Sequence, residues 1–159
     1  MDNKLLKQLS RLAGSKTLIV GIGNTLKSDD GAGPLVCEKL QRSKITADII
    51  DAGSAPENYI QPVVKKAPQD LLVIDAIDSG ASAGTISIFK PEQLSSIIVS
   101  THTLSPRLFT DMVCQQIDVQ VFFIGIQPKH VQLGREVSRE VNNAIRELAD
   151  TLTGIFAVR

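Results

Sequence analysis

Short, continuous apolar runs constrain the fold of this chain more than any other feature of its sequence. Residues 17–22 form such a run, in which polar and apolar positions do not alternate. This pattern is typical of a strand that is buried on both faces of a parallel sheet. Comparable runs follow at residues 47–50, 71–74, 85–89 and 119–125.

Segments with helical periodicity lie between these runs. Strands that alternate with helices predict a single-domain, three-layer α/β/α sandwich with a mostly parallel five-stranded sheet over residues 1–159. The run at 85–89 follows its predecessor after a short connection, so we expect it to be antiparallel or at an edge. The helical segments span residues 32–42, 56–66, 105–117 and 134–154, and the last has a predicted buried stripe of Val137, Val141, Ile145, Leu148 and Leu152.

Size and charge exclude several classes of protein. A chain of 159 residues is long enough for one self-sufficient domain. Lysine plus arginine and aspartate plus glutamate both number 17, so the basic surface of a nucleic-acid-binding protein is not expected. No apolar run approaches the roughly 18 residues of a membrane span. We therefore expect a soluble, cytoplasmic monomer without nucleic-acid or membrane partners.

The N-terminal segment and the two cysteines have simple structural interpretations. Residues 1–12 are too polar for a signal peptide and predict a short amphipathic helix with Leu5, Leu9 and Leu12 on one side. Cys37 and Cys114 lie in apolar helical segments without the C-x-x-C spacing of zinc or redox sites. We predict that both are buried, reduced thiols.

Three acid-bearing loops, at residues 21–34, 51–58 and 75–80, come just after or between apolar runs. Because the carboxyl ends of parallel strands meet at one edge of a sheet, all three loops are expected at the same edge. Open α/β folds place their ligand sites at that edge. This edge is the candidate active site.

The first of these loops has the start of a dinucleotide-binding motif but not the rest of it. Gly21 and Gly23 match the motif, whereas the third glycine would fall on Leu26, and Asp29 and Asp30 would repel a pyrophosphate. A P-loop is also excluded, and we expect no nucleotide cofactor. A structural role remains open for the two acids, and for Asp29 we expect helix capping.

Asp75 and the histidines suggest a metal site. Asp75 directly follows a buried strand, although it could instead cap the next turn, alone or with Asp78. His102 lies in a polar loop before a helix, whereas His130 resembles an exposed turn residue. Asp30, Asp75 and His102 together would form a set of oxygen, oxygen and nitrogen ligands suited to nickel or zinc. A serine triad is less probable because no G-x-S-x-G motif occurs.

Several motifs in consistent order resemble those of the hydrogenase maturation endopeptidases. The likeness is greatest to the HycI-like subgroup, which processes the large subunit of the formate-hydrogenlyase type of [NiFe] hydrogenase. The resemblance covers residues 17 to 150 and does not include residues 1–16. The motifs are GIGN at 21–24, DDGAGP at 29–34, DAGSAPEN at 51–58, LVIDA at 72–76, DSG at 78–80, STH at 100–102 and FIGIQP at 123–128.

The resemblance implies a hydrolase that acts on the nickel-loaded precursor of a [NiFe]-hydrogenase large subunit. Members of the family remove a short C-terminal extension from this precursor, and the nickel belongs to the substrate. The family's metal-contacting and catalytic residues correspond to Asp30, Asp75 and His102. Residues that we expect to line the substrate cleft are Gly23, Asn24, Asp51, Gly53 and Ser54.

Two other functions remain open from the sequence. The chain could be a non-catalytic α/β module that binds a divalent metal or a small polar ligand at the same edge. A nucleotide-binding protein is the third interpretation, which Leu26 and the pair of adjacent acids disfavour.

Overall fold

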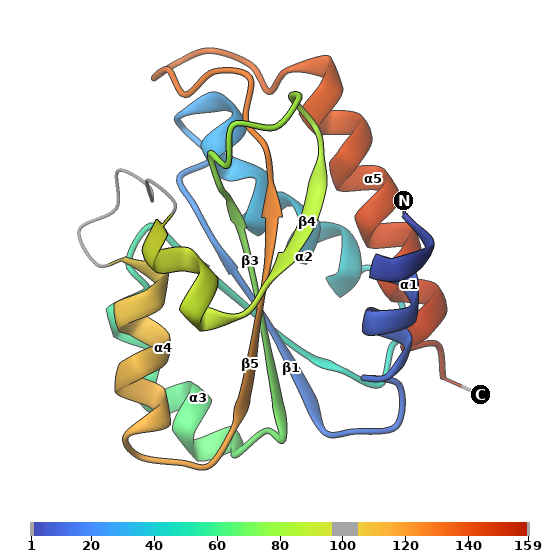
Figure 1. The fold of residues 1–159 in the computed structure, drawn as a ribbon, viewed down its shortest axis with the longest axis vertical. Helices are drawn as coiled ribbons and strands as arrows, with labels where there is room; N and C mark the ends of the chain where they lie inside the picture. Colours follow the sequence, from blue (N-terminus) through green and yellow to red (C-terminus); the bar gives the residue numbers. More distant parts are fainter. Residues whose placement is uncertain (1, 97–104, 159) are drawn as a thin grey trace.

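The computed structural model describes residues 2–96 and 105–158, which form a three-layer α/β/α sandwich (Figure 1). One five-stranded sheet has the order β2-β1-β3-β5-β4. Four strands are parallel, and β4 is antiparallel to β5 at one edge. The fold predicted from the sequence is confirmed, as is the placement of the fourth strand. The strands are β1 Thr17–Ile22, β2 Asp48–Gly53, β3 Asp70–Ala76, β4 Ile86–Phe89 and β5 Gln120–Ile126.

The helices cover both faces of the sheet (Figure 1). On one face α1 (Asn3–Ser10), α2 (Ala32–Gln41) and α5 (Arg139–Ile155) share a hydrophobic core with alternate strand residues such as Ile19 and Leu72. On the other face α3 (Ile60–Lys66) and α4 (Pro106–Cys114) pack against the intervening residues, among them Leu18 and Val20. This alternation follows from the two-residue period of a strand. Short 3₁₀ turns occur at η1 (Ser28–Gly31), η2 (Pro56–Tyr59) and η3 (Pro91–Ser96).

Helix α1 has the predicted amphipathic character. Leu5, Leu9 and Leu12 are buried in the core that α1 shares with α5. Among the described residues, no helix combines the length and apolar character that a membrane span requires.

The last helix begins later than its periodicity predicts. The sequence pattern starts at residue 134, whereas α5 starts at Arg139. The reason is Ser138, whose side chain accepts a hydrogen bond from the amide of Val141 and so caps the helix. The predicted stripe is buried at Val141, Ile145, Leu148 and Leu152, while Val137 precedes the helix and is partly buried.

The two cysteines have different environments. Cys37 is buried, and its burial, together with the negative charge of Asp51, raises the pKa of its thiol to about 12. The prediction of a buried thiol is wrong for Cys114, which is exposed at the end of α4. Its neighbour Val113 occupies the buried position of that turn, so Cys114 lies on the outer side of the helix.

Helix α2 approaches the sheet unusually closely at Gly33. A Cβ atom on Gly33 would lie 2.3 Å from the carbonyl oxygen of Ile74 and 2.4 Å from that of Ile22. Only glycine permits this approach. As a result, the beginning of α2 and the preceding turn η1 sit directly over the ends of β1 and β3.

Candidate active site

Asp30 and Asp75 lie at the same edge of the sheet, where the parallel strands end. Asp75 is the penultimate residue of β3, pairs with Gly125 and is fully buried. Asp30 lies in η1, which contacts β3, and the residue is 3% exposed. Residues 45 positions apart in the sequence therefore meet at one edge because β1 and β3 are adjacent parallel strands.

Backbone amides hold both carboxylates. The Asp30 Oδ2 atom accepts a hydrogen bond from the amide of Asn24 at 3.1 Å. The Asp75 Oδ1 atom accepts one from the amide of Ala76 at 2.8 Å. Neither side chain has the freedom of an exposed aspartate, so both carboxylates are oriented before any ligand arrives.

Gly23 and Gly53 shape the backbone beside Asp30. A Cβ atom on Gly23, whose φ is +148°, would lie 2.0 Å from the carbonyl oxygen of Asp30. The Gly23 amide donates to the carbonyl of Gly53 at 2.9 Å, which joins the ends of β1 and β2. Of the residues predicted to line a cleft, Gly23, Asn24 and Gly53 therefore lie at this edge close to Asp30.

Asp51 and Ser54 lie at the end of the neighbouring strand β2. Both are exposed, and Asp51 belongs to the strand, opposite Gly21. Its Oδ1 atom accepts a hydrogen bond from the amide of Gly53 at 3.0 Å, which shapes the turn after β2. Strand β1 separates β2, which carries Asp51, from β3, which carries Asp75.

His102, the third predicted metal ligand, lies outside the described residues. Within residues 2–96 and 105–158, no three histidine, cysteine or acidic residues come together as a metal-binding group. The proposed set of Asp30, Asp75 and His102 therefore stays a prediction.

Asp29 has a structural role, but not the one predicted. It caps neither η1 nor α2. Instead, its fully buried carboxylate accepts hydrogen bonds from four donors in the segment between β5 and α5. Burial alone would raise the pKa of Asp29, but these hydrogen bonds outweigh it and the pKa is lowered. The four donors are the amide and hydroxyl of Ser138 at 2.6 and 2.9 Å, the amide of Lys129 at 2.8 Å and the amide of His130 at 3.2 Å.

Ser28 makes a second connection to the same segment. Its hydroxyl donates to the carbonyl of His130 and accepts from the amide of Gln132, each at 3.0 Å. The Nδ1 atom of His130 also lies 3.1 Å from this hydroxyl. His130 is therefore half-buried and tied to Ser28, in contrast to the exposed turn residue expected from the sequence. Ser28 has a φ of +49°, which is unusual for a residue other than glycine.

Asp78 and Gln127 organise the loop after β3. Asp78 Oδ1 accepts hydrogen bonds from the Gln127 side chain at 3.0 Å and from the amide of Gly80 at 3.1 Å. These bonds lower the pKa of Asp78, and the bond from Gln127 has the largest effect. The Oε1 atom of Gln127 in turn accepts from the amides of Ser79 and Ala81. Asp78 therefore stabilises this turn, a role that the sequence left open for Asp75 alone or together with Asp78. Sequence reasoning missed Gln127, and only the FIGIQP motif around it gave any signal.

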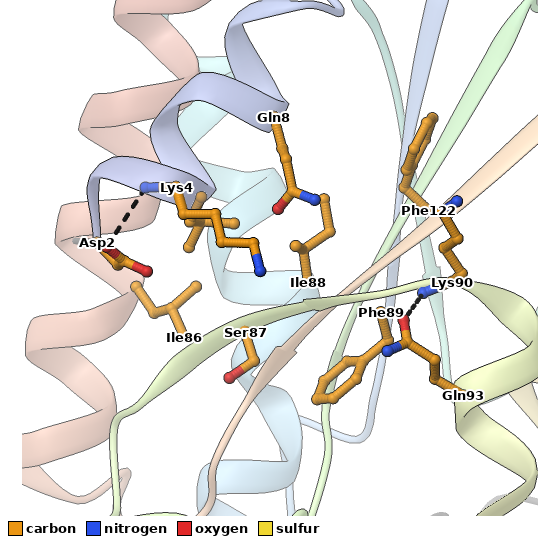
Figure 2. A pocket seen from close by; sticks show the side chains of 11 residues that line it. Asp2, Lys4, Gln8, Ile86, Ser87, Ile88, Phe89, Lys90, Gln93 and Phe122 are labelled. Carbon is orange, nitrogen blue, oxygen red and sulfur yellow. Dashed lines mark hydrogen bonds between the residues drawn. The ribbon is translucent and has the colours of Figure 1, made fainter.

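A groove of about 420 Å³ lies elsewhere on the molecule (Figure 2). It runs between α1 and the edge strand β4, with Lys4 and Gln8 on the helix side and Ile86 and Ile88 on the strand. Strand β5 separates β4 from β3, which carries Asp75, and none of the predicted site residues lines the groove. The two buried acids, and not the groove, therefore define the candidate active site.

Comparison with known proteins decides the family. The model of the HycI hydrogenase maturation proteases matches residues 34–155, which is more than half of the chain. The chain belongs to this family. Hydrogenase 3 maturation protease of Escherichia coli K12 is 33% identical over 139 residues, covering 86% of this chain and 88% of that protein.

Two further hydrogenase maturation proteases, one of them putative, match almost the whole chain. A putative hydrogenase maturation protease of Methanocaldococcus jannaschii is 30% identical over 165 residues, with 98% of this chain and 96% of that protein covered. Such coverage must include most of residues 1–16, so the match to this relative extends into the N-terminal segment. The crystal structure of HycI from Thermococcus kodakarensis superposes with a TM-score of 0.85 at 29% identity, covering 94% of this chain and 97% of that one.

Proposed function

We propose that this HycI-family protease removes a C-terminal extension from the large-subunit precursor of a [NiFe] hydrogenase and recognises nickel already inserted in that precursor. One observation carries the proposal: two oriented, buried carboxylates, Asp30 and Asp75, lie at one sheet edge in a member of a hydrogenase maturation protease family. The relatives' names support a hydrogenase as the substrate.

The chemistry of the acids suits this role. Carboxylate oxygens and an imidazole nitrogen are ligands that nickel accepts, and Asp30, Asp75 and His102 would supply them. Since the two carboxylates are buried, their attraction to a cation is screened less than it would be in water. A metal held jointly by the precursor and the protease would keep the scissile segment in place. A metal in that position would polarise a carbonyl or lower the pKa of a bound water.

The direct test uses two forms of one precursor. Purified protein is incubated with nickel-loaded and with nickel-free large-subunit precursor, and loss of the C-terminal extension is measured by mass spectrometry. We expect cleavage of the nickel-loaded form only. Equal cleavage of both forms would show that the protein is a peptidase that does not recognise nickel. Binding of the nickel-loaded form without cleavage would instead identify a non-catalytic metal-binding module.

A further inference from the structure

Three large apolar side chains are exposed on two loops at the candidate active edge. Leu26 is 69% exposed in the loop after β1, and Val131 and Leu133 are 38% and 75% exposed in the loop after β5. We refer to Leu26, Val131 and Leu133 as the apolar lip. Large apolar side chains that gather at an exposed position commonly mark a surface for another protein.

Hydrogen bonds join the two loops into one unit. The amide of Gly134 donates to the carbonyl of Leu26 at 2.9 Å. Two residues farther along the first loop, the Ser28 hydroxyl bonds to both His130 and Gln132. Figure 1 shows the loop after β5 passing across the top of the molecule, beside the segment that leads into α2. A surface held in this way loses little conformational entropy when a partner binds.

The apolar lip lies beside Asp30. Its first loop runs from β1 into η1, where Asp30 is located, and Asn24 at the start of this loop donates its amide to the Asp30 carboxylate. The second loop supplies the amides that bind Asp29, the neighbour of Asp30. A protein that docks on the lip is therefore brought directly to the proposed metal-contacting acids.

Basic residues outnumber acidic ones around the lip, where the exposed Glu136 follows Arg135. Residues 24–28 and 129–135 include Lys27, Lys129 and Arg135 but no acidic residue. Lys129 forms an ion pair with Glu140 at 2.7 Å, which leaves Lys27 and Arg135 as the cations flanking the leucines. An apolar surface with a positive rim is complementary to apolar side chains flanked by acidic ones.

We propose that the apolar lip is the docking surface for the folded body of the hydrogenase precursor, which contacts it through apolar side chains flanked by acidic groups. This inference rests on the proposed function, because it names the surface through which the same substrate is held. Asp30 and Asp75 would contact the metal, whereas Leu26 and Leu133 would determine which protein reaches them.

The test compares the double variant Leu26→Ser/Leu133→Ser with Val158→Ser. Val158 is also exposed, at 62%, but it follows α5 at the opposite end of the sheet, so it is a matched control. We expect the double variant to raise KM for the nickel-loaded precursor about tenfold or more, with kcat changed less than about twofold. The control should match the wild type in both constants, and all three proteins should melt alike.

Direct binding of the nickel-loaded precursor separates this inference from the proposed function. Labelled precursor should bind the double variant about tenfold more weakly than the wild type, whether or not cleavage is observed. Leu133→Glu should weaken binding more than Leu133→Lys, since only the glutamate repels an acidic partner. Unchanged affinity in the folded double variant would overturn the inference. Self-association of the wild type that these substitutions abolish would overturn it too, by assigning the lip to a second copy of this chain.

Discussion

Asp29 and Asp30 are neighbours in the chain, but their surroundings differ. The Asp29 carboxylate is surrounded by four donors from the segment between β5 and α5. The Asp30 carboxylate instead faces the edge of the sheet and accepts from the amide of Asn24. The first acid thus stabilises the loop that carries the second one.

Asp29→Asn should destabilise the protein by about 3 kcal/mol at neutral pH, because an amide cannot replace a buried, multiply bonded charge. Since hydrogen bonds lower the pKa of Asp29 in the fold, its stabilising contribution is fully present above the ordinary aspartate pKa of about 3.9. It is lost as the pH falls through the lower, folded-state pKa. Urea unfolding should therefore show a smaller difference between variant and wild type in strong acid. Asp150→Asn, at an exposed position on α5, serves as the control and should change stability by less than about 0.5 kcal/mol.

Asp75→Asn separates a metal ligand from a structural residue. Asparagine keeps the Oδ1 acceptor that the amide of Ala76 uses, but it lacks the negative charge that a metal prefers. We expect the variant to lose cleavage of nickel-loaded precursor and to bind it more weakly, while its melting temperature stays close to that of the wild type. A purely structural role predicts the opposite pattern, with cleavage retained and a loss of stability of about 1 kcal/mol.

The two histidines should respond differently to substitution. His102→Ala should abolish processing in a folded protein, since it removes a predicted ligand. His130→Ala should retain cleavage and lose about 1 kcal/mol of stability, because the Nδ1 atom of His130 lies within hydrogen-bonding distance of Ser28. Processing assays and thermal melting on both variants check this. If both folded variants lost activity equally, the assignment of the two histidines would be wrong.

At the scale of elements, the close contact between α2 and the strand ends positions the active edge. Gly33 allows the first turn of α2 to touch the carbonyl groups of Ile22 and Ile74, at the ends of β1 and β3. Asp30 lies one turn before Gly33, and Asp75 comes directly after Ile74. This close contact between helix and sheet therefore helps to set the spacing between the two acids.

Gly33→Ala should push α2 away from the sheet, since its Cβ atom would lie 2.3 Å from a backbone oxygen that cannot move aside. We expect a loss of about 3 kcal/mol in unfolding free energy, the cost of overpacking, together with impaired cleavage as Asp30 moves. Gly154→Ala in α5 is the matched control. Its Cβ atom would meet nothing within 4 Å, so this variant should gain about 0.5–1 kcal/mol and keep full activity. Chemical denaturation of both proteins measures the contrast.

At the scale of the whole molecule, two hydrophobic cores lie on opposite faces of one sheet, and the exposed Leu26 and Leu133 lie on loops at the carboxyl ends of its strands. The candidate active site and the apolar lip both lie at these ends, whereas Val158 and the end of α5 lie at the other. We expect a monomer whose sedimentation coefficient does not change with concentration. A stable dimer in sedimentation velocity would contradict this and would require a new assignment for the apolar lip.

The sequence by itself determined the layers of the fold and the edge where Asp30 and Asp75 meet. Apolar runs and helical periodicity can be identified from residues that are close together in the sequence. In a parallel sheet, the loops that follow the strands then lie at the same edge. The family motifs likewise indicate the hydrogenase maturation protease family. The predicted boundary was less accurate at residues 134–138, because the cap at Ser138 makes the helix begin later than the periodic pattern does.

Only the tertiary structure decided how the loops at that edge are held. Asp29 and Ser28 bond to residues 100 or more positions away, and no local pattern contains such partners. The outward position of Cys114, the connection between His130 and Ser28 and the contacts of Gln127 also depend on how separate elements pack. Hydrophobic periodicity records which face of an element is buried, whereas hydrogen bonds between distant loops form only once the sheet has brought those loops together.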